Sequence, residues 1–278
     1  MHRDDVATAG TSTGPVLGNL DPALETAWHP VAPSGELRPG GWLQVRLLGR
    51  TWTLHRTDRL AADPPAHGVR ERLGVVWLAP GEPRDVPLEV AEDGDRRFVT
   101  GRLRSRRSAA AAGVVADALL DAAHARSGAV PPAAVSPEPG GSRSVRGDRA
   151  AGRRLTSVHR APFQLLLREE SRDAGAVRTL LLLLQPEDAD STRVHPRLLL
   201  SAGSGRPLPA PADVAREVAA AQRVLDEDLA AVAHLAGTGL ALAGRDGPPV
   251  PADRPGAELR RALCEFVLSA PVRHRGAA

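Results

Sequence analysis

Two carboxylates and an imidazole recur at helical spacing in the segment 113–131, and these residue types can do chemistry together. Asp117, Asp121 and His124 stand at positions i, i+4 and i+7, so a helix would carry all three on one stripe. Oxygen and imidazole ligands of this kind can hold a metal cation. The alternative is a polar stripe that faces water on a helix packed by its other side.

The same segment predicts the helix that would position these groups. A helix over about 114–126 fits the Ala-rich run, because Gly128 after it can adopt a positive φ and Pro131 cannot continue a helix. Val114, Val115, Leu119 and Ala122 lie around the rest of its surface.

Composition indicates an ordinary globular protein without a basic face. The 278 residues are 42% hydrophobic and 25% charged, and the net charge is only +3. All basic residues are arginines, and their clusters at 96–107 and 143–154 are not interleaved with aromatics. We therefore expect neither nucleic acid nor a membrane as a partner, since no apolar run approaches 18 residues.

The single cysteine limits the cofactors and the compartment. Cys264 alone excludes an intrachain disulfide and any centre held by several thiolates. It reads as a small core residue of a final helix, and we expect a cytoplasmic protein.

The order of elements predicts an α+β fold. Residues 1–20 are expected to be a disordered lead-in, and the residues from 21 to 105 read as short strands with a hairpin turn at Gly49-Arg50. After the helix, residues 132–154 are rich in Pro, Gly, Ser and Arg and predict a long loop. Strand-like runs follow at 155–169, 176–185 and 192–202, the last two as an antiparallel hairpin, and then helices at 212–234, with an N-cap at Ala212-Asp213, and 256–268.

Several segments resemble the oxygenase (α) subunit of Rieske non-haem iron aromatic ring-hydroxylating oxygenases of the vanillate-demethylase type. They are Ala27-Trp-His-Pro-Val-Ala, the run from Val69 to Pro83, Asp121-Ala-Ala-His124, and Gln222-Arg-Val-Leu-Asp-Glu-Asp228. The third is similar to the family's iron motif N-x-x-D-x-x-H-x4-H. The resemblance implies an antiparallel sheet wrapping helices, a helix-grip-like catalytic domain over 106–278, preceded by a small β-rich Rieske-like unit over 21–105. It further implies a mononuclear non-haem iron, an apolar or aromatic small-molecule substrate and a homotrimer.

The sequence departs from the family at both metal centres. A Rieske cluster needs two thiolates and two imidazoles, but residues 57–68, which stand where the cluster loops would be, contain no cysteine. We therefore expect a remnant without a [2Fe-2S] cluster. At the iron motif the resemblance makes His124 and Asp228 metal ligands and Asp121 the catalytic bridging carboxylate, whereas Ala129 stands at the second His position and Ala118 at the Asn position.

Two functions remain open on these residues. The chain is either an oxidoreductase related to the iron-dependent oxygenases, with its missing ligand supplied by Asp117, His159, His195, His234 or substrate, or a degenerate site. In the second case oxygenase activity is impaired or lost, and the chain is a non-catalytic small-molecule-binding or accessory module that keeps the pocket. Both readings expect the 114–126 and 212–234 helices side by side over the 155–202 sheet, with His124 and Asp228 facing each other across a pocket.

Overall fold

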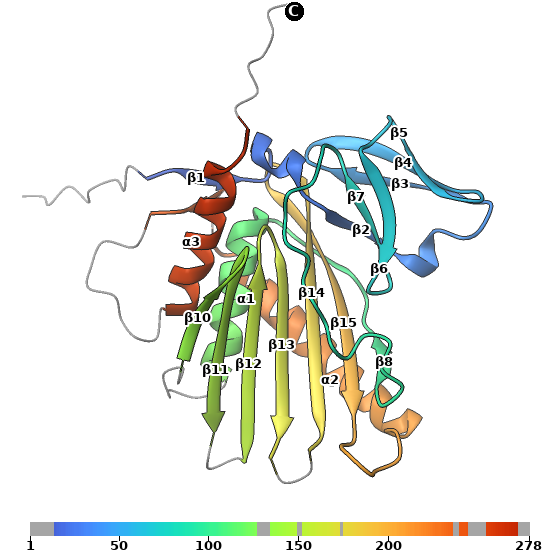
Figure 1. Ribbon diagram of the computed structural model, residues 1–278, viewed down its shortest axis with the longest axis vertical. Helices are drawn as coiled ribbons and strands as arrows, with labels where there is room; N and C mark the ends of the chain where they lie inside the picture. The colour runs from blue at the N-terminus through green and yellow to red at the C-terminus, as the bar shows by residue number, and fades with distance from the viewer. Residues whose placement is uncertain are drawn as a thin grey trace, which may run out of the picture.

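The computed structural model describes residues 14–126, 134–148, 152–172, 175–235, 239–243 and 254–271. Within them, helices cover one face of a large antiparallel sheet, and a smaller group of strands packs on the other face (Figure 1). This mixture of helices and antiparallel sheet confirms the α+β class.

The large sheet is the frame of the molecule. Its described part has eight strands in the order β10-β11-β12-β13-β14-β15-β8, with β9 also paired to β15. The predicted antiparallel hairpin over 176–202 is confirmed as the long central pair of strands. The first of these two strands is buried along almost its whole length, as expected for an apolar run covered on both faces of the sheet. The strands are β8 (Val99–Arg102), β9 (Arg106–Ser108), β10 (Ala134–Glu138), β11 (Gly141–Asp148), β12 (Arg153–Arg160), β13 (Gln164–Ser171), β14 (Val177–Asp188) and β15 (Ser191–Ser201).

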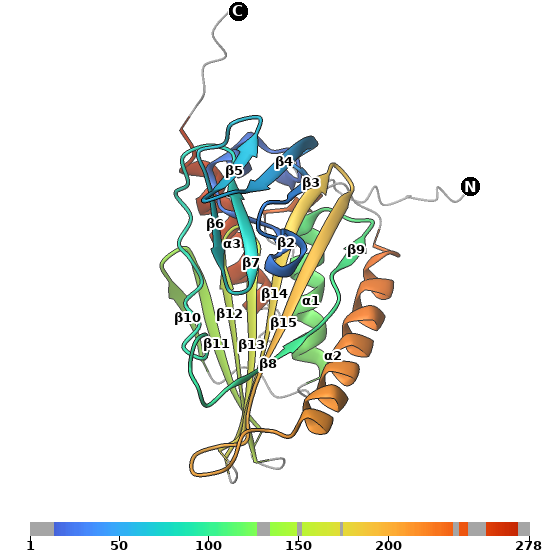
Figure 2. The ribbon, with the colours of Figure 1, turned by 90° about the vertical axis from the view of Figure 1, so that its right-hand side faces the viewer.

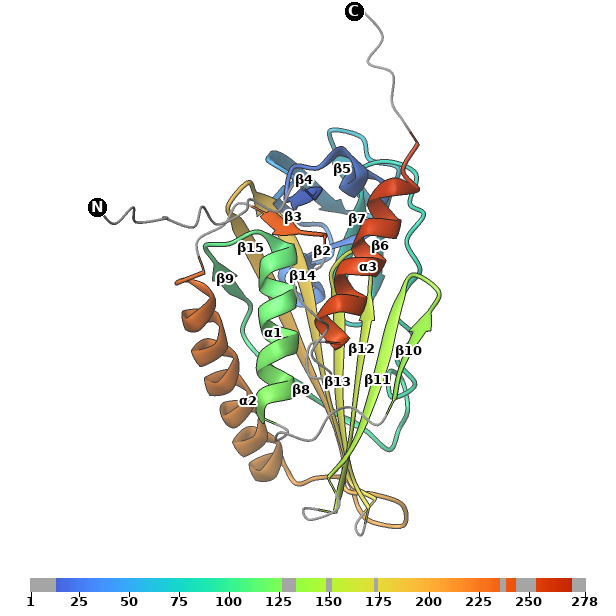
Figure 3. The same cartoon turned by 90° about the vertical axis from the view of Figure 1, so that its left-hand side faces the viewer.

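Three helices of the described chain lie side by side on one face of this sheet (Figure 3). They are α1 (Ala112–Arg126), α2 (Pro211–Val232) and α3 (Arg254–Leu268), each within two residues of its predicted bounds. Leu119, Leu225 and Leu263 from these helices join Leu165 and Leu182 of the sheet in one buried core. The predicted N-cap of α2 is wrong: Ala210 takes that position, and Pro211 begins the helix because its fixed φ suits the first helical residue.

The opposite face of the sheet is covered by the smaller strands (Figure 2). They form two three-stranded antiparallel sheets in the described chain, β2-β7-β6 and β3-β4-β5. Trp77 of β7 is buried against Leu181 and Leu183 of β14. The elements here are η1 (Pro22–Thr26), β2 (His29–Pro33), η2 (Ser34–Glu36), β3 (Trp42–Leu47), β4 (Arg50–Arg56), β5 (Leu60–Asp63), β6 (Gly68–Arg72) and β7 (Val75–Ala79).

Two short strands, one near each end of the described chain, pair with each other. β1 (Val16–Gly18) pairs antiparallel with β16 (Gly239–Ala241). The next residue, Asn19, is fully buried; its amide donates to the carbonyls of Asp188 and Ser191, and its Oδ1 accepts the N–H of Ala112 at the start of α1. The described end of the expected lead-in, residues 14–20, is therefore ordered by these pairings, and residues 1–13 lie outside the described part.

Two expectations for the middle of the chain are wrong. Most of the predicted 132–154 loop is the hairpin β10–β11. The strand β11 is polar and contains glycines, but hydrogen bonds to β12 along its whole length hold its backbone in the sheet. The run 155–169 is two strands, β12 and β13, because the turn at 161–163, with Pro162 at its centre, separates them.

The proposed boundary at 105 does not coincide with a change of sheet. β8, expected in the first unit, pairs with β15 of the large sheet. No described helix is both long enough and apolar enough to cross a membrane.

Candidate functional site

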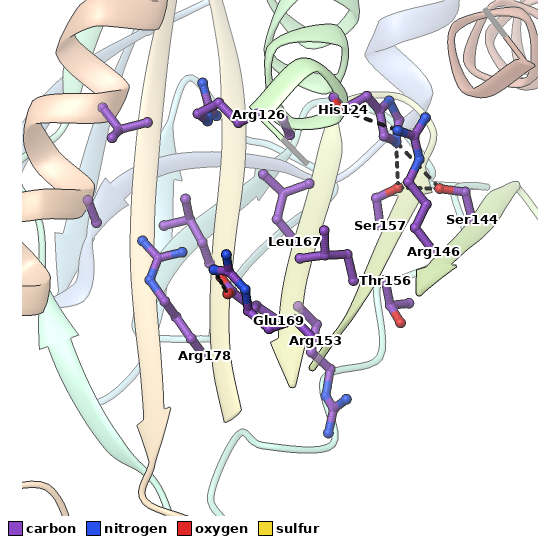
Figure 4. Close-up of a pocket in the computed structure, with 16 residues that line it drawn as sticks. His124, Arg126, Ser144, Arg146, Arg153, Thr156, Ser157, Leu167, Glu169 and Arg178 are labelled. Carbon is purple, nitrogen blue, oxygen red and sulfur yellow. Dashed lines mark hydrogen bonds and ion pairs between the residues drawn. The ribbon is translucent and has the colours of Figure 1, made fainter. Parts of the chain in front are cut away.

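A cavity of about 260 Å³ lies between α1, α2 and the strands β11 to β14. Its wall is apolar where Leu155, Leu167 and Leu180 of the sheet meet Ala221 and Val224 of α2. Polar groups gather at its inner end around His124, and charged groups gather at its rim (Figure 4).

His124 points from the last turn of α1 toward the sheet. Its Nε2 lies 3.1 Å from the Ser157 hydroxyl of β12 and 3.4 Å from the Ser144 hydroxyl of β11. The two hydroxyls are 2.6 Å apart, because Ser144 and Ser157 stand directly opposite each other in the ladder. His124 is thus the one residue of the predicted stripe that reaches this cavity.

Arg146 of β11 completes the inner end. It is buried, and its guanidinium donates to the main-chain carbonyl of His124 at 3.3 Å, in the last turn of α1 where helix carbonyls lack internal partners. Burial lowers the pKa of Arg146. Burial, with a smaller effect of the Arg146 charge, lowers the pKa of His124 to about 4, so this imidazole is neutral at neutral pH.

Asp117 and Asp121 face a different neighbour, the first turn of α3. A Cβ placed on Gly256 would lie 3.1 Å from Asp117 Oδ1 and 3.7 Å from Asp121 Oδ1. Asp117 also forms an ion pair with Arg260 further along α3. Carboxylates are stabilised near a helix N-terminus, and this location accounts for two members of the predicted stripe.

Asp228 of α2 is held by an arginine of α1. Its Oδ1 is 2.6 Å from the Arg126 guanidinium, and its side chain is 14% exposed. Arg126 lines the same cavity as His124 (Figure 4). The helices lie side by side as expected. The His124 imidazole is directed to the Ser157 and Ser144 hydroxyls of the sheet, whereas Asp228 contacts Arg126.

The other expected sources of a third ligand have neighbours of their own. Buried His159 lies 3.3 Å from the Pro162 carbonyl, and buried His195 bonds Gln185 and Ser105. His195 is paired with Leu183, which belongs to the core on the far face of the sheet. His234 is exposed just beyond the end of α2, and Ala129, the second His position of the motif, lies outside the described residues.

Solved structures share this architecture, although no family model and no curated protein matches the sequence. NdmA of Pseudomonas putida CBB5, as a QL mutant with caffeine, has a TM-score of 0.69 at 15% identity, covering 94% of this chain and 100% of that one. NdmB of the same organism has a TM-score of 0.68 at 14% identity over 93% and 100%. Apo dicamba monooxygenase has a TM-score of 0.65 at 14% identity over 88% and 97%. All three are Rieske-type oxygenases. This chain has their fold.

The described residues do not fit the iron centre that this oxygenase fold implies. No group of three or more His, Cys, Asp or Glu side chains that could hold a metal occurs among them. Of the two expected ligands, Asp228 already carries a guanidinium on its carboxylate. A facial triad of two imidazoles and one carboxylate is the donor set that such iron requires.

The cluster position of the oxygenase fold is equally unsuited. A [2Fe-2S] centre of this type needs two thiolates, and the single cysteine of the sequence, Cys264, lies in α3 and packs on the helix-side core. His55 belongs to β4, and His67 stands between β5 and β6. Two imidazoles alone do not make that cluster.

Proposed function

We propose that this chain is a small-molecule-binding protein built on the oxygenase fold, without iron-dependent oxygenation. A concave site with an apolar wall and a few convergent polar groups is typical of pockets for organic molecules, and the cavity beside α1 has both features. The similar structures include one of NdmA with caffeine and one of dicamba monooxygenase bound to dicamba. An apolar or aromatic small molecule is therefore the ligand class that we expect.

The observation that carries this proposal is the ion pair between Arg126 and Asp228. A carboxylate that ligates iron(II) must turn its lone pairs to the metal, whereas the Asp228 oxygen lies 2.6 Å from a cation. Bringing iron(II) to that oxygen would place two positive charges side by side in a partly buried site, which is costly. The proposal therefore treats the pair as a structural link between α1 and α2.

The iron-dependent alternative would use His124 and Asp228 as ligands and Asp121 as the catalytic bridging carboxylate. An iron bound there would supply oxygen activation. This alternative requires Arg126 to move away from Asp228, and it requires a further ligand to bind the iron together with His124. Stoichiometric iron(II) binding by wild-type protein with a dissociation constant in the low micromolar range or below would favour this alternative and overturn our proposal.

Binding and metal content can be measured on the same protein. We expect anaerobic calorimetry to detect no stoichiometric iron(II) uptake, and ligand-observed NMR to detect binding of small aromatic amides and of caffeine. Leu167→Trp should fill the cavity and abolish this binding. The matched control is Leu268→Trp, because Leu268 is 76% exposed at the end of α3; equal loss in both variants would contradict binding in the cavity.

The remaining features implied by the resemblance are also proposals. We propose that residues 106–278 are a helix-grip-like domain, that residues 21–105 are a Rieske-like remnant, and that the protein is a cytoplasmic homotrimer. Light scattering on purified protein should then give three times the chain mass of 29.2 kDa.

A further inference from the structure

An open groove of about 740 Å³ lies between α2 and the segment that leads from β8 to β9 (Figure 2). It shares no lining residue with the cavity beside α1. We propose that this groove binds an acidic segment of a partner protein in an extended conformation, as an added strand beside β8. The surface is separate from the ligand cavity, so the inference is independent of the proposed function.

The strand β8 is the last strand at this edge of the large sheet. It pairs antiparallel with β15 on one side, and no described strand lies on its other side. Successive residues of an antiparallel strand direct their backbone N–H and C=O groups alternately to the two sides. The edge of β8 therefore presents backbone groups to which a further strand can bind.

The helix α2 follows this edge. Just beyond the end of β8, the Arg104 N–H donates to the side-chain oxygen of Gln222 at 2.8 Å. At the strand itself, Gly101 lies close to Val218, because a Cβ on Gly101 would be 2.6 Å from the Val218 side chain. A chain in the groove therefore contacts both the edge of β8 and α2.

The length of the groove suits a short extended peptide. The exposed residues Ala215, Ala219 and Ala230 of α2 line it, and their small side chains leave room for those of a bound strand. From the first to the last of them the helix rises about 22 Å, at 1.5 Å per residue. An extended chain covers that distance with about seven residues.

Two arginines give the groove an excess of positive charge. Arg102 and Arg104 are exposed, and neither forms an ion pair with a described carboxylate. The two carboxylates that line the groove, Asp226 and Glu227, are each paired with another arginine. Because Arg102 and Arg104 are two residues apart, acidic side chains at alternate positions of an added strand can approach both of them.

The same charges disfavour other occupants. Antiparallel pairing of this edge with that of a second copy would bring arginines toward arginines, and like charges on facing strands are destabilising. A single-stranded nucleic acid would find no aromatic side chain to stack on among the lining residues, and Asp226 and Glu227 would repel its phosphates. An acidic peptide satisfies both the backbone edge and the two guanidiniums.

The test uses the full-length protein and a fluorescein-labelled peptide of four Val-Glu repeats, with binding measured by fluorescence anisotropy at low ionic strength. A peptide with Gln in place of Glu should bind at least about fivefold more weakly, since two exposed ion pairs are lost. The double variant Arg102→Gln, Arg104→Gln should weaken binding of the acidic peptide by a similar factor. The matched control removes the same charge elsewhere, by Arg38→Gln and Arg206→Gln at exposed positions outside the groove, and should bind as the wild type does.

Two further comparisons test the groove and the strand pairing. Ala219→Trp should fill the groove and weaken binding at least about fivefold, whereas Ala212→Trp, at an exposed position of the same helix outside the groove, should not. A peptide of the same charge with N-methyl groups on alternate amides cannot donate hydrogen bonds from those amides to a strand edge. It should also bind at least about fivefold more weakly.

Four results would overturn the inference, and none of them bears on the ligand cavity. Equal binding of the Glu and Gln peptides would remove the role of charge, and equal loss in both arginine double variants would show attraction that is not specific to the groove. Undiminished binding of the N-methylated peptide would exclude an added strand. Tighter binding of an oligothymidylate of the same net charge than of the acidic peptide would show a nucleic-acid surface instead.

Discussion

The ion pair between Arg126 and Asp228 bears on whether side chains of α1 and α2 can bind one metal ion together. Restoring the missing imidazole tests it, because Ala129→His recreates the H-x4-H spacing after His124. Even losing an outer-shell partner costs about 10 to 100-fold in metal affinity. We therefore expect this variant to raise iron(II) affinity by at least tenfold in anaerobic calorimetry.

The control for that variant removes the imidazole already present. His124→Ala in the Ala129→His background should abolish the gain, since the two histidines would then act as a pair. An unchanged affinity in the single variant would show that the Arg126 contact, and not the missing histidine, keeps iron away. Adding Arg126→Gln to the Ala129→His variant would then be expected to allow iron(II) to bind.

Sequence reasoning found part of the site. Its motif spacing singled out His124, which lines the cavity, as a metal ligand, and that role stays a prediction. The helical period placed Asp117 and Asp121 on the same helix, although these two face α3. Sequence reasoning missed Ser144 and Arg146 because they were assigned to a loop. No apolar alternation marks that segment, because the alternate positions of β11 that are buried, 142, 144 and 146, are Ser, Ser and Arg.

The strand β11 carries Ser144 and Arg146 of the cavity wall. The glycines near its two ends differ in how much space surrounds them. A Cβ on Gly141 would lie 1.9 Å from the His159 carbonyl oxygen, whereas on Gly147 it would meet the mobile end of the Arg172 side chain at 3.2 Å. Gly141→Ala should therefore destabilise the protein by about 1–3 kcal/mol through overpacking. Gly147→Ala should change the free energy of unfolding by less than about 1 kcal/mol.

Urea denaturation of both variants measures this difference. Because Gly141 begins the strand that carries Ser144 and Arg146, its substitution should also weaken ligand binding, whereas the substitution at Gly147 should not. Equal destabilisation by the two variants would contradict the close approach of β11 to β12.

Helices and strands were predictable to different degrees, for physical reasons. The helices α1, α2 and α3 carry local signals, such as Gly128 and Pro131 after the first, so their predicted bounds were within two residues. The hairpin β10–β11 has no such signal. Pro137 and Gly141 disfavour a strand locally, and only the ladder to β12, a tertiary contact, stabilises it.

At the scale of the whole molecule, buried histidines should make stability depend on pH. Desolvation lowers the pKa of His29 and His159 to about 4 and that of His195 to about 3, below the ordinary value of about 6.5. The unfolded chain therefore binds more protons below pH 6.5, and stability falls as the pH drops from 6.5 to about 4. Each fully buried imidazole can contribute on the order of 3 kcal/mol to that fall.

His159→Gln tests this dependence, because a glutamine amide keeps a donor for the Pro162 carbonyl but takes up no proton. The loss of unfolding free energy between pH 6.5 and 4, measured by urea denaturation, should be smaller in this variant by on the order of 3 kcal/mol. His234→Gln, at an exposed position, is the control and should behave as the wild type does. A wild-type profile that is flat over this range would contradict the prediction.

The pairing of β1 with β16 has a consequence for how the protein is made. Val16 needs Ala241 as its partner, and at about 5–20 residues per second the ribosome takes roughly 10 to 45 seconds to translate the chain between them. During that interval Leu17 does not have β16 beside it. The edge of β1 therefore stays unpaired while all of the large sheet and α2 are synthesised, and an unpaired edge is a site at which other chains can associate.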